Sequence, residues 1–185
     1  MNKTARIVLL NGVGSAGKGS IAKALQTMTT ECFLHVEMDA FLQMLPEDTW
    51  GHPDGIIFET VQEHGKPSVV IKTGPVAERM LRGMRHAIAA MAAQGNNLIV
   101  DEVLLGSERA EYAELLSAFE VFLVGVFAPL DVLESRELQR GDRLIGLARW
   151  QYDRVHTGMT YDLEVDTSSA TPMECADLIR QKFGL

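Results

Sequence analysis

Short runs of β-branched and other apolar residues alternate along the chain with longer segments in which apolar positions recur every three or four residues. The runs predict strands at 6–10, 33–37, 98–100, 121–127 and 163–165. The helical pattern predicts helices at 18–28, 75–91, 130–140, 145–156 and 172–183. This alternation is typical of an α/β fold in which crossover helices cover both faces of an open parallel sheet. We therefore expect one domain over residues 1–185 with a parallel sheet of about five strands.

One stretch departs from the alternation. Apolar residues at 55–58 and 69–72 flank the polar segment 63–66, which predicts a β-hairpin inserted at about 50–73. Ligands of open α/β sheets bind beyond the carboxyl ends of the strands. We expect the hairpin to lie beside that ligand site.

The composition narrows the class of protein. Of 185 residues, 46% are hydrophobic and 23% are charged, which excludes collagen-like and wholly disordered chains. The net charge of −8 at pH 7 would repel a nucleic-acid backbone, so we expect no nucleic-acid partner. Cys32 and Cys175 cannot alone form a zinc site, and we expect both to be small buried residues in a reducing compartment.

Two apolar runs could direct the chain to a membrane. The run 7–10 follows Lys3 and Arg6 but is too short for a signal peptide. The run 121–130 has about half of the ~20 residues that a membrane helix requires. We therefore expect a cytoplasmic protein with no membrane partner, and the sequence leaves the oligomeric state open.

A glycine-rich segment follows the first predicted strand and opens the first predicted helix. It has the spacing G-x-x-x-x-G-K of a P-loop. In such a loop, backbone N–H groups and the helix N-terminus bind phosphate, while the lysine reaches the β- and γ-phosphates of ATP. A glycine turn that only caps a helix would not explain the lysine at this spacing. The predicted nucleotide contacts are Gly12, Gly14, Ser15, Ala16, Gly17, Lys18, Gly19 and Ser20.

The residue after Lys18 is Gly19, where a serine or threonine commonly gives its hydroxyl to Mg²⁺. The hydroxyl arrives one residue later, at Ser20. We therefore expect Mg²⁺ to be held by phosphates, water, carboxylates and Ser20. The form GKG followed by a hydroxyl residue is similar to the loop of adenylate kinases and favours small kinases over switch GTPases.

Carboxylates follow two of the predicted strands. Asp39 comes just after 33–37, and Asp101 with Glu102 ends the strand at 98–100. Asp39 is placed to take the proton of an attacking hydroxyl, and Asp101 to lie near Mg²⁺. Alternatively, Asp39 caps the next helix, and Asp101 marks the point where a buried strand reaches water.

Three arginines are spaced so that they share one helix face if the helix continues past 140. They are Arg136, Arg140 and Arg143. Guanidinium groups that close over transferring phosphates stabilise charge and exclude water, which predicts a catalytic lid at about 136–148. The alternative is a solvated face in which these arginines pair with Glu134 and Glu137.

Five strings, in order through nearly the whole chain, resemble the chloramphenicol phosphotransferases and related small P-loop kinases. They are NGVGSAGKGS at 11–20, EMDAFLQMLP at 37–46, LIVDEVLL at 98–105, RELQRGDRLIGLA at 136–148 and VHTGMTYDLEVDTS at 155–168. Many unrelated ATPases share the glycine-rich loop. The RGDR segment followed by H-x-G-x-x-Y-D-x-E-V-D-T is far more particular and carries the resemblance.

The resemblance implies transfer of the ATP γ-phosphate to a primary hydroxyl of a small molecule, which inactivates an antibiotic in the member that names the family. By position, Lys18 matches the phosphate-binding lysine and Asp39 the base. Arg140 and Arg143 match the lid arginines. A place near the adenine is implied for Asp166-Thr167, although 161–167 could equally be sheet packing with a polar end. The order Gly19-Ser20 departs from the sequence GKS of the member that names the family. This chain and that member are therefore expected to differ in their metal contact.

An apolar wall could bind an aromatic or lipophilic acceptor, or it could be ordinary core beneath the hairpin. Its residues are Phe41, Met44, Leu45, Trp50 and Phe58.

Two other functions stay open. A nucleotide or sugar kinase with an anionic acceptor would need basic groups, and the hairpin carries Lys66 and Lys72 but no arginine. An ATP-binding switch without turnover would be expected to have a degraded site. His156 is expected to be structural or a supporting hydrogen-bond donor.

Overall fold

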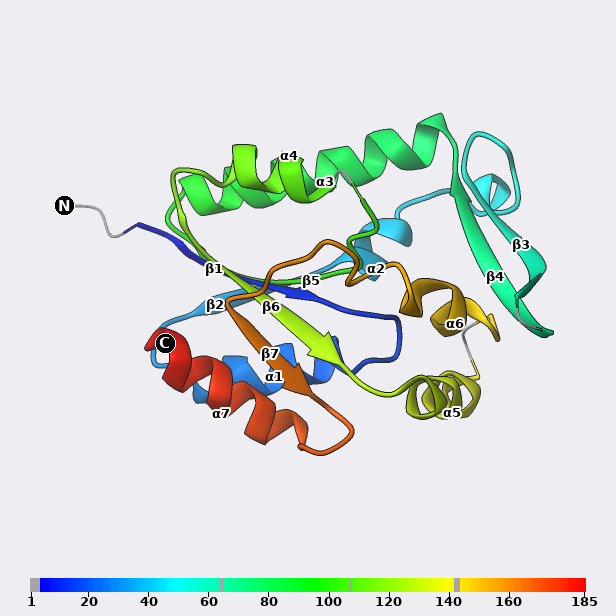
Figure 1. Ribbon diagram of the computed structural model, residues 1–185. Coiled ribbons are helices and arrows are strands. Elements are labelled where there is room, and N and C mark those ends of the chain that lie inside the picture. The colour runs from blue at the N-terminus through cyan, green and yellow to red at the C-terminus, as the bar shows by residue number, and fades with distance from the viewer. Residues whose placement is uncertain (1–3, 64, 107, 142–143) are drawn as a thin grey trace.

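The computed structural model describes residues 4–63, 65–106, 108–141 and 144–185. A five-stranded sheet in the order β2-β5-β1-β6-β7 forms its centre (Figure 1). Each adjacent pair is parallel, which confirms the predicted α/β class. The strands are β1 (Arg6–Asn11), β2 (Phe33–Glu37), β5 (Asn97–Glu102), β6 (Glu120–Phe127) and β7 (Leu163–Asp166). This order puts β1, and the glycine-rich loop that follows it, at the middle of the carboxyl edge.

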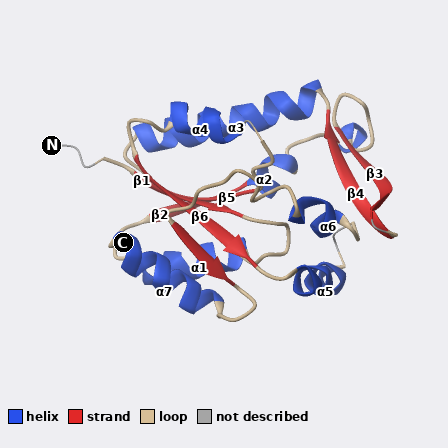
Figure 2. Cartoon of the chain, in the orientation of Figure 1, coloured by secondary structure: helices blue, strands red, loops and turns tan. Residues whose placement is uncertain are grey.

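Helices cover both faces of the sheet because successive strand residues point to opposite sides. In β1, Ile7 and Leu9 pack toward α3 (Pro75–Ala93) and α4 (Glu108–Leu115). Val8 and Leu10 pack toward α1 (Lys18–Met28) and α7 (Pro172–Phe183). Figure 2 shows these two helical layers, with α5 (Leu130–Arg140) and α6 (Leu147–Tyr152) beyond the carboxyl ends of the strands. The core is therefore divided by the sheet into two layers.

The β3–β4 hairpin lies apart from the main sheet. Its strands, β3 (Ile56–Glu63) and β4 (Lys66–Thr73), pair antiparallel with each other. The short α2 (Met38–Leu42) and the 3₁₀ turn η1 (Glu47–Thr49) connect β2 to it. The hairpin contacts the start of α6, where the Val69 N–H donates to the Gly146 carbonyl at 3.0 Å. This contact fixes the hairpin at the same end of the sheet as the glycine-rich loop.

Helix boundaries differ from the predictions where glycine intervenes. α5 ends at Arg140 because Gly141 adopts the left-handed conformation, with φ of 69°. Gly146, with φ of 102°, precedes α6, so the helix predicted at 145–156 spans only Leu147–Tyr152. The helix α5 therefore does not continue past 140. The predicted arginine face also includes Arg143, which lies outside the described residues.

Two further findings concern the composition arguments. Cys175 is buried as expected, whereas Cys32 is exposed, so the prediction of two buried cysteines is wrong for Cys32. It lies in the turn before β2, where the chain has not yet entered the sheet. Within the described ranges, no helix combines the length and apolar character needed to cross a membrane.

Candidate active site

The glycine-rich loop forms a concave backbone turn between β1 and α1. Ser15 has φ of 68° and Gly17 has φ of 91°, so two residues of the loop are left-handed. Among the described residues, Ser15 is the one non-glycine residue with a positive φ. Alternation of this kind turns successive N–H groups toward one point and forms an anion-binding nest. The local backbone therefore has the shape that the spacing predicted.

The N-terminus of α1 is open to a ligand. Among the described residues, no side chain caps it, and its first turn contains no acidic residue. The N-terminus of α7 is closed by contrast, because Thr171 and Glu174 form a reciprocal capping box. Unpaired N–H groups together with the positive end of the helix dipole favour an anion at α1.

Lys18 is buried at the mouth of this loop, with 6% of its surface exposed. Its Nζ donates hydrogen bonds to the carbonyl oxygens of Gly12 at 2.9 Å and Val13 at 3.1 Å. It also lies 3.5 Å from Oδ1 of Asp101, so the lysine from α1 and the carboxylate from β5 form an ion pair. The structure thus brings together the predicted phosphate-binding lysine and the predicted metal-binding carboxylate.

Carboxylates gather at the ends of β2 and β5. Glu37 lies opposite Asp101 in the parallel register, so the two side chains leave the same face of the sheet. Asp39, the predicted base, is the second residue of α2 and is half-buried at the same carboxyl edge. Sequence reasoning did not select Glu37, although its place two residues before Asp39 at a strand end was a signal.

A cavity of about 420 Å³ extends from the loop toward α5 and α7. Arg140 and Ser20 both line it. Ser20 therefore faces this cavity and not the carboxylates at the ends of β2 and β5. Arg143 lies outside the described residues. The full lining is Ser15, Gly17, Ser20, Arg136, Gln139, Arg140, Thr167 and Pro172. A basic, partly open cavity beside a phosphate-binding loop suits the rest of a nucleotide.

Arg136 contacts protein groups instead of standing free over the loop. Its guanidinium donates to Oγ1 of Thr167 at 2.8 Å and to the Thr167 carbonyl at 2.7 Å. The Thr167 hydroxyl in turn donates to the carbonyl of Ala16 at 2.9 Å. This chain braces the glycine-rich loop from behind. Asp166 is exposed at the end of β7, and its carboxylate accepts two hydrogen bonds from Ser168, which lower its pKa.

Two buried polar side chains, one from α5 and one from α6, support the site and were not predicted. Glu137 is 2% exposed, and its carboxylate accepts from the Gly146 and Ala148 N–H groups, each at 2.8 Å. The solvated face considered for this glutamate is therefore wrong. Gln151 is 3% exposed, and its Oε1 accepts from the Gly14 N–H at 2.7 Å. Glu137 thus holds the start of α6, and α6 holds the glycine-rich loop.

A network behind the loop ties β1 to the segment before β7. The buried amide of Asn11 donates to the Val155 carbonyl at 3.0 Å and to the Tyr161 hydroxyl at 2.8 Å. Nδ1 of His156 lies 2.6 Å from the same hydroxyl, and its ring stacks on Phe127 at 3.9 Å. Burial, with the nearby positive Lys18, lowers the pKa of His156 to about 4. His156 is therefore a neutral supporting residue at physiological pH.

A second buried carboxyl group lies next to Asp101. The hydroxyl of Tyr112, from α4, donates to Oε2 of Glu102 at 2.6 Å. Burial raises the pKa of Glu102 to about 7, against the opposing effects of Tyr112 and the positive Arg85. Glu102 is 2% exposed, whereas 20% of the Asp101 side chain is exposed, so Asp101 is the more accessible acid of this pair.

The residues of the predicted apolar wall differ in how they pack. Trp50 and Phe58 stack with ring centroids 6.1 Å apart, and Met44 is 66% exposed. Leu45 is buried in the small core of the hairpin, and Phe41 packs against the layer under α3. Trp50, which precedes β3, is 39% exposed, and Phe58 of β3 also packs against the cluster that contains Leu45.

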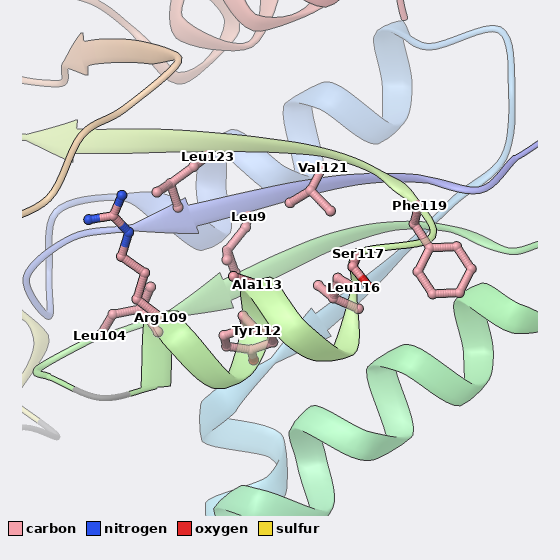
Figure 3. Close-up of a pocket in the computed structure, with 10 residues that line it drawn as sticks. All are labelled: Leu9, Leu104, Arg109, Tyr112, Ala113, Leu116, Ser117, Phe119, Val121 and Leu123. Atoms are coloured by element: carbon pink, nitrogen blue, oxygen red, sulfur yellow. The ribbon is translucent and has the colours of Figure 1, made fainter.

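Figure 3 shows another cavity, of about 310 Å³, between α4 and the strands β1 and β6. Leu9, Val121 and Leu123 face it from the sheet, and Leu116 faces it from the turn that follows α4. None of its lining residues belongs to the glycine-rich loop. It is a gap in the second apolar layer, on the opposite side of the sheet from the α1 and α7 layer.

The sheet order, the loop with its lysine and the arginine-lined cavity define a phosphotransferase of the P-loop kinase class. Comparison with known sequences identifies the family within this class. The chain belongs to the chloramphenicol phosphotransferase-like protein family, which it matches over residues 5–184. Proteins from two strains of Mycobacterium tuberculosis, each provisionally named an O-phosphotransferase, are 31% identical over 186 residues; the match covers 96% of this chain and 82% of theirs.

Solved structures of distant kinases share the fold. The M. tuberculosis APS kinase CysC, in complex with AMPPNP and APS, has a TM-score of 0.67 at 16% identity, covering 98% of this chain and 99% of that one. A sugar kinase from Janibacter sp. HTCC2649 has a TM-score of 0.64 at 19% identity, covering 98% and 95%. A tunicamycin resistance protein of Deinococcus radiodurans has a TM-score of 0.65 at 18% identity, covering 98% and 96%. At these identities the similarity concerns the fold alone.

Proposed function

We propose that the protein transfers the γ-phosphate of ATP to a hydroxyl group of a small molecule. The observation that carries the proposal is the ion pair of Lys18 and Asp101 beside the open N-terminus of α1. In this reaction the bond from the γ-phosphorus to the ADP oxygen breaks, and a bond from the γ-phosphorus to the acceptor oxygen forms. The proton of the acceptor hydroxyl passes to a carboxylate.

The nucleotide would lie along the glycine-rich loop. Residues 12–20 would bind the phosphates through backbone N–H groups, and Lys18 would neutralise the β- and γ-phosphates. The 420 Å³ cavity between α5 and α7 would hold the sugar and base. Thr167 lines this cavity and supports the loop by donating to the Ala16 carbonyl, and Asp166 precedes it at the end of β7.

Asp39 would act as the general base, because it follows β2 at the edge where Lys18 and Asp101 meet. The segment 136–148 would act as the lid. Within it, Arg140 lines the nucleotide cavity and would stabilise the transferring phosphate. Arg136 would act indirectly, by bracing Thr167. Arg143 stays in this proposal on sequence grounds.

Mg²⁺ would accompany ATP and would neutralise the charge that develops on the phosphates during transfer. The residues present fit this ion, because Mg²⁺ in such sites is bound by one or two carboxylates, phosphates and water. Asp101 supplies a carboxylate whose Oδ2 faces the space beside Gly19. Ser20, the other predicted metal contact, lines the nucleotide cavity instead.

The hairpin favours an uncharged aromatic acceptor. Lys72 pairs with Glu59, and Arg154 of the segment after α6 pairs with Glu63 at 2.9 Å. These basic groups are already neutralised, so an acceptor that carries a phosphate gains little from them. The stacked Trp50 and Phe58 rings offer a flat apolar surface instead. Chloramphenicol, the acceptor that the family resemblance implies, has these properties.

The test is acceptor-dependent release of ADP from Mg-ATP, with detection of the phosphorylated product by mass. The panel contains chloramphenicol, other hydroxyl-bearing antibiotics, nucleosides and sugars. We expect turnover with a neutral aromatic alcohol. If nucleosides or sugars are phosphorylated instead, the proposed acceptor is wrong and the protein is a nucleoside or sugar kinase. ATP binding without any product would indicate a switch without turnover.

A further inference from the structure

In most P-loops the residue after the lysine is a serine or threonine whose hydroxyl binds Mg²⁺. In this chain that residue is Gly19, which has no side chain. The space that a side chain at Gly19 would fill is bounded by carboxylates. A Cβ atom at this position would lie 3.3 Å from Oδ2 of Asp101 and 3.6 Å from Oε1 of Glu37. Two acidic oxygens therefore converge on the place where the missing hydroxyl would begin.

The sheet holds these oxygens in place. Glu37 and Asp101 are register partners on the adjacent parallel strands β2 and β5, and Leu10 of β1 is the partner of Asp101 on the other side. The loop and α1 follow β1 directly (Figure 1). Because three hydrogen-bonded strands fix these positions, the carboxylates do not depend on a loop for their approach to Gly19.

The local charges leave room for a cation. The Lys18 ammonium pairs with Asp101 at 3.5 Å, but its nearer contacts are the Gly12 and Val13 carbonyls. The closest basic group to Glu37 among the described ion pairs is Nδ1 of His35, at 3.4 Å. Among the described ion pairs, Glu37 therefore has no lysine or arginine partner.

Ser20 does not occupy this space. It lines the cavity with Arg136, Arg140 and Thr167, and that lining includes neither carboxylate. Neighbouring residues of a helix point about 100° apart, so Gly19 faces the acidic side while Ser20 faces the nucleotide cavity. A hydroxyl at Ser20 therefore does not stand in for the one missing at Gly19.

We propose that Glu37, together with Asp101, binds the divalent cation that accompanies the nucleotide, directly or through its coordinated water, in place of the hydroxyl absent at Gly19. The proposal rests on the proposed use of ATP. It explains why glycine stands after the lysine: a serine there would crowd two carboxylates. The protein would hold the ion with two acids and no hydroxyl, a set that Mg²⁺ and Mn²⁺ accept.

The test measures metal binding without turnover. Mn²⁺ is titrated into the whole protein with AMPPNP, and free Mn²⁺ is followed by electron paramagnetic resonance. AMPPNP affinity is measured separately in EDTA. We expect Glu37→Gln to weaken Mn²⁺ binding about 10- to 100-fold while leaving the EDTA affinity unchanged. Glu114→Gln, on the exposed side of α4, is the matched control and should change neither value.

A second pair of variants tests the same site by adding the hydroxyl that is missing at Gly19. Gly19→Ser alone should weaken Mn²⁺ binding, because its side chain meets the two carboxylates. Combined with Glu37→Ala, the new serine gains space, and we expect Mn²⁺ affinity to recover to within about 10-fold of wild type. If Glu37→Gln fails to fold, this double variant and Glu37→Asp carry the test.

The outcomes separate the two proposals. If wild type binds AMPPNP neither with Mn²⁺ nor in EDTA, the proposed function is overturned and this inference falls with it. If wild type shows metal-dependent binding and Glu37→Gln shows the same Mn²⁺ affinity, the inference is wrong and the proposed function stands. Metal dependence that is lost in Glu37→Gln and kept in Glu114→Gln supports both.

Discussion

Replacing Glu137 tests whether α6 is held by a buried carboxylate. Glu137 is 2% exposed and accepts hydrogen bonds from the Gly146 and Ala148 N–H groups, each at 2.8 Å. Glu137→Ala removes both acceptors and leaves two buried donors unpaired. Each unpaired buried donor costs about 1–3 kcal/mol, so we expect the free energy of unfolding to fall by about 2–6 kcal/mol. Because ordinary domains have about 5–15 kcal/mol in total, this is a large fraction.

The assay is urea denaturation followed by circular dichroism, together with hydrogen exchange at individual amides. Glu137→Gln keeps the shape but only one acceptor, so its loss should be about half that of alanine. Exchange should accelerate at the Gly146 and Ala148 amides before the rest of the chain. Leu138→Ala, at a neighbouring position that is 65% exposed, is the control and should stay within about 0.5 kcal/mol of wild type.

A small effect would refute this reasoning. If Glu137→Ala unfolds within about 0.5 kcal/mol of wild type and the two amides keep their protection, water must satisfy these donors as well as the carboxylate does. The carboxylate would then be a lesser part of the contact between α5 and α6.

Four further predictions concern the site. Asp39→Ala should retain ATP binding but lose at least ~100-fold in kcat, as measured by acceptor-dependent ADP release; near-normal turnover would remove Asp39 as the base. Lys18→Ala should raise the KM for ATP and lower kcat whatever the acceptor, and unchanged ATP kinetics would contradict the role of the loop. Gln151→Leu leaves the Gly14 N–H without its acceptor, so it should affect ATP use more than the global melting temperature; equal ATP kinetics would show that the loop holds itself. Glu102 has a pKa of about 7 in the folded protein, above its ordinary value of 4.5. Between these two pH values the folded state therefore binds more protons than the unfolded state. The free energy of unfolding should fall as pH rises through this window. The difference between wild type and Glu102→Gln in urea melts from pH 5 to 8 isolates this effect, because His156 contributes the opposite slope in both, and parallel curves would contradict it.

Most of the fold could be predicted because each strand and long helix carries its own periodicity. The five sheet strands stand where apolar runs occur; β1, β6 and β7 are one residue longer than predicted, and β5 is three residues longer. The helix α4 was missed because its sequence, ERAEYAEL, has no apolar stripe, and only Tyr112 in it is buried. Its position is set by contact with the sheet and α3, which local sequence does not encode.

The site could be predicted only where its chemistry is local. The glycine-rich loop reaches its shape within a few residues, so spacing alone identified Lys18. The contact of Gln151 with Gly14 joins residues 137 positions apart, and nothing in either neighbourhood indicates it. Glu137 reads as a surface residue between arginines, and its burial follows from the turn at Gly141 that returns the chain across α5.

Main-chain hydrogen bonds hold the β3–β4 hairpin, alongside its small apolar core and the ion pair of Glu63 with Arg154. Val69 N–H donates to the Gly146 carbonyl at 3.0 Å, and Gly74 N–H donates to the Gly55 carbonyl at 2.7 Å. Such bonds do not depend on which side chains the strands carry. Exposed hairpin positions can therefore be exchanged at little cost in folding free energy, whereas truncation in the sheet core costs about 2–5 kcal/mol. Under the proposed function, the exposed hairpin positions are the place to build a library for altered acceptor specificity, with the glycine-rich loop left unchanged.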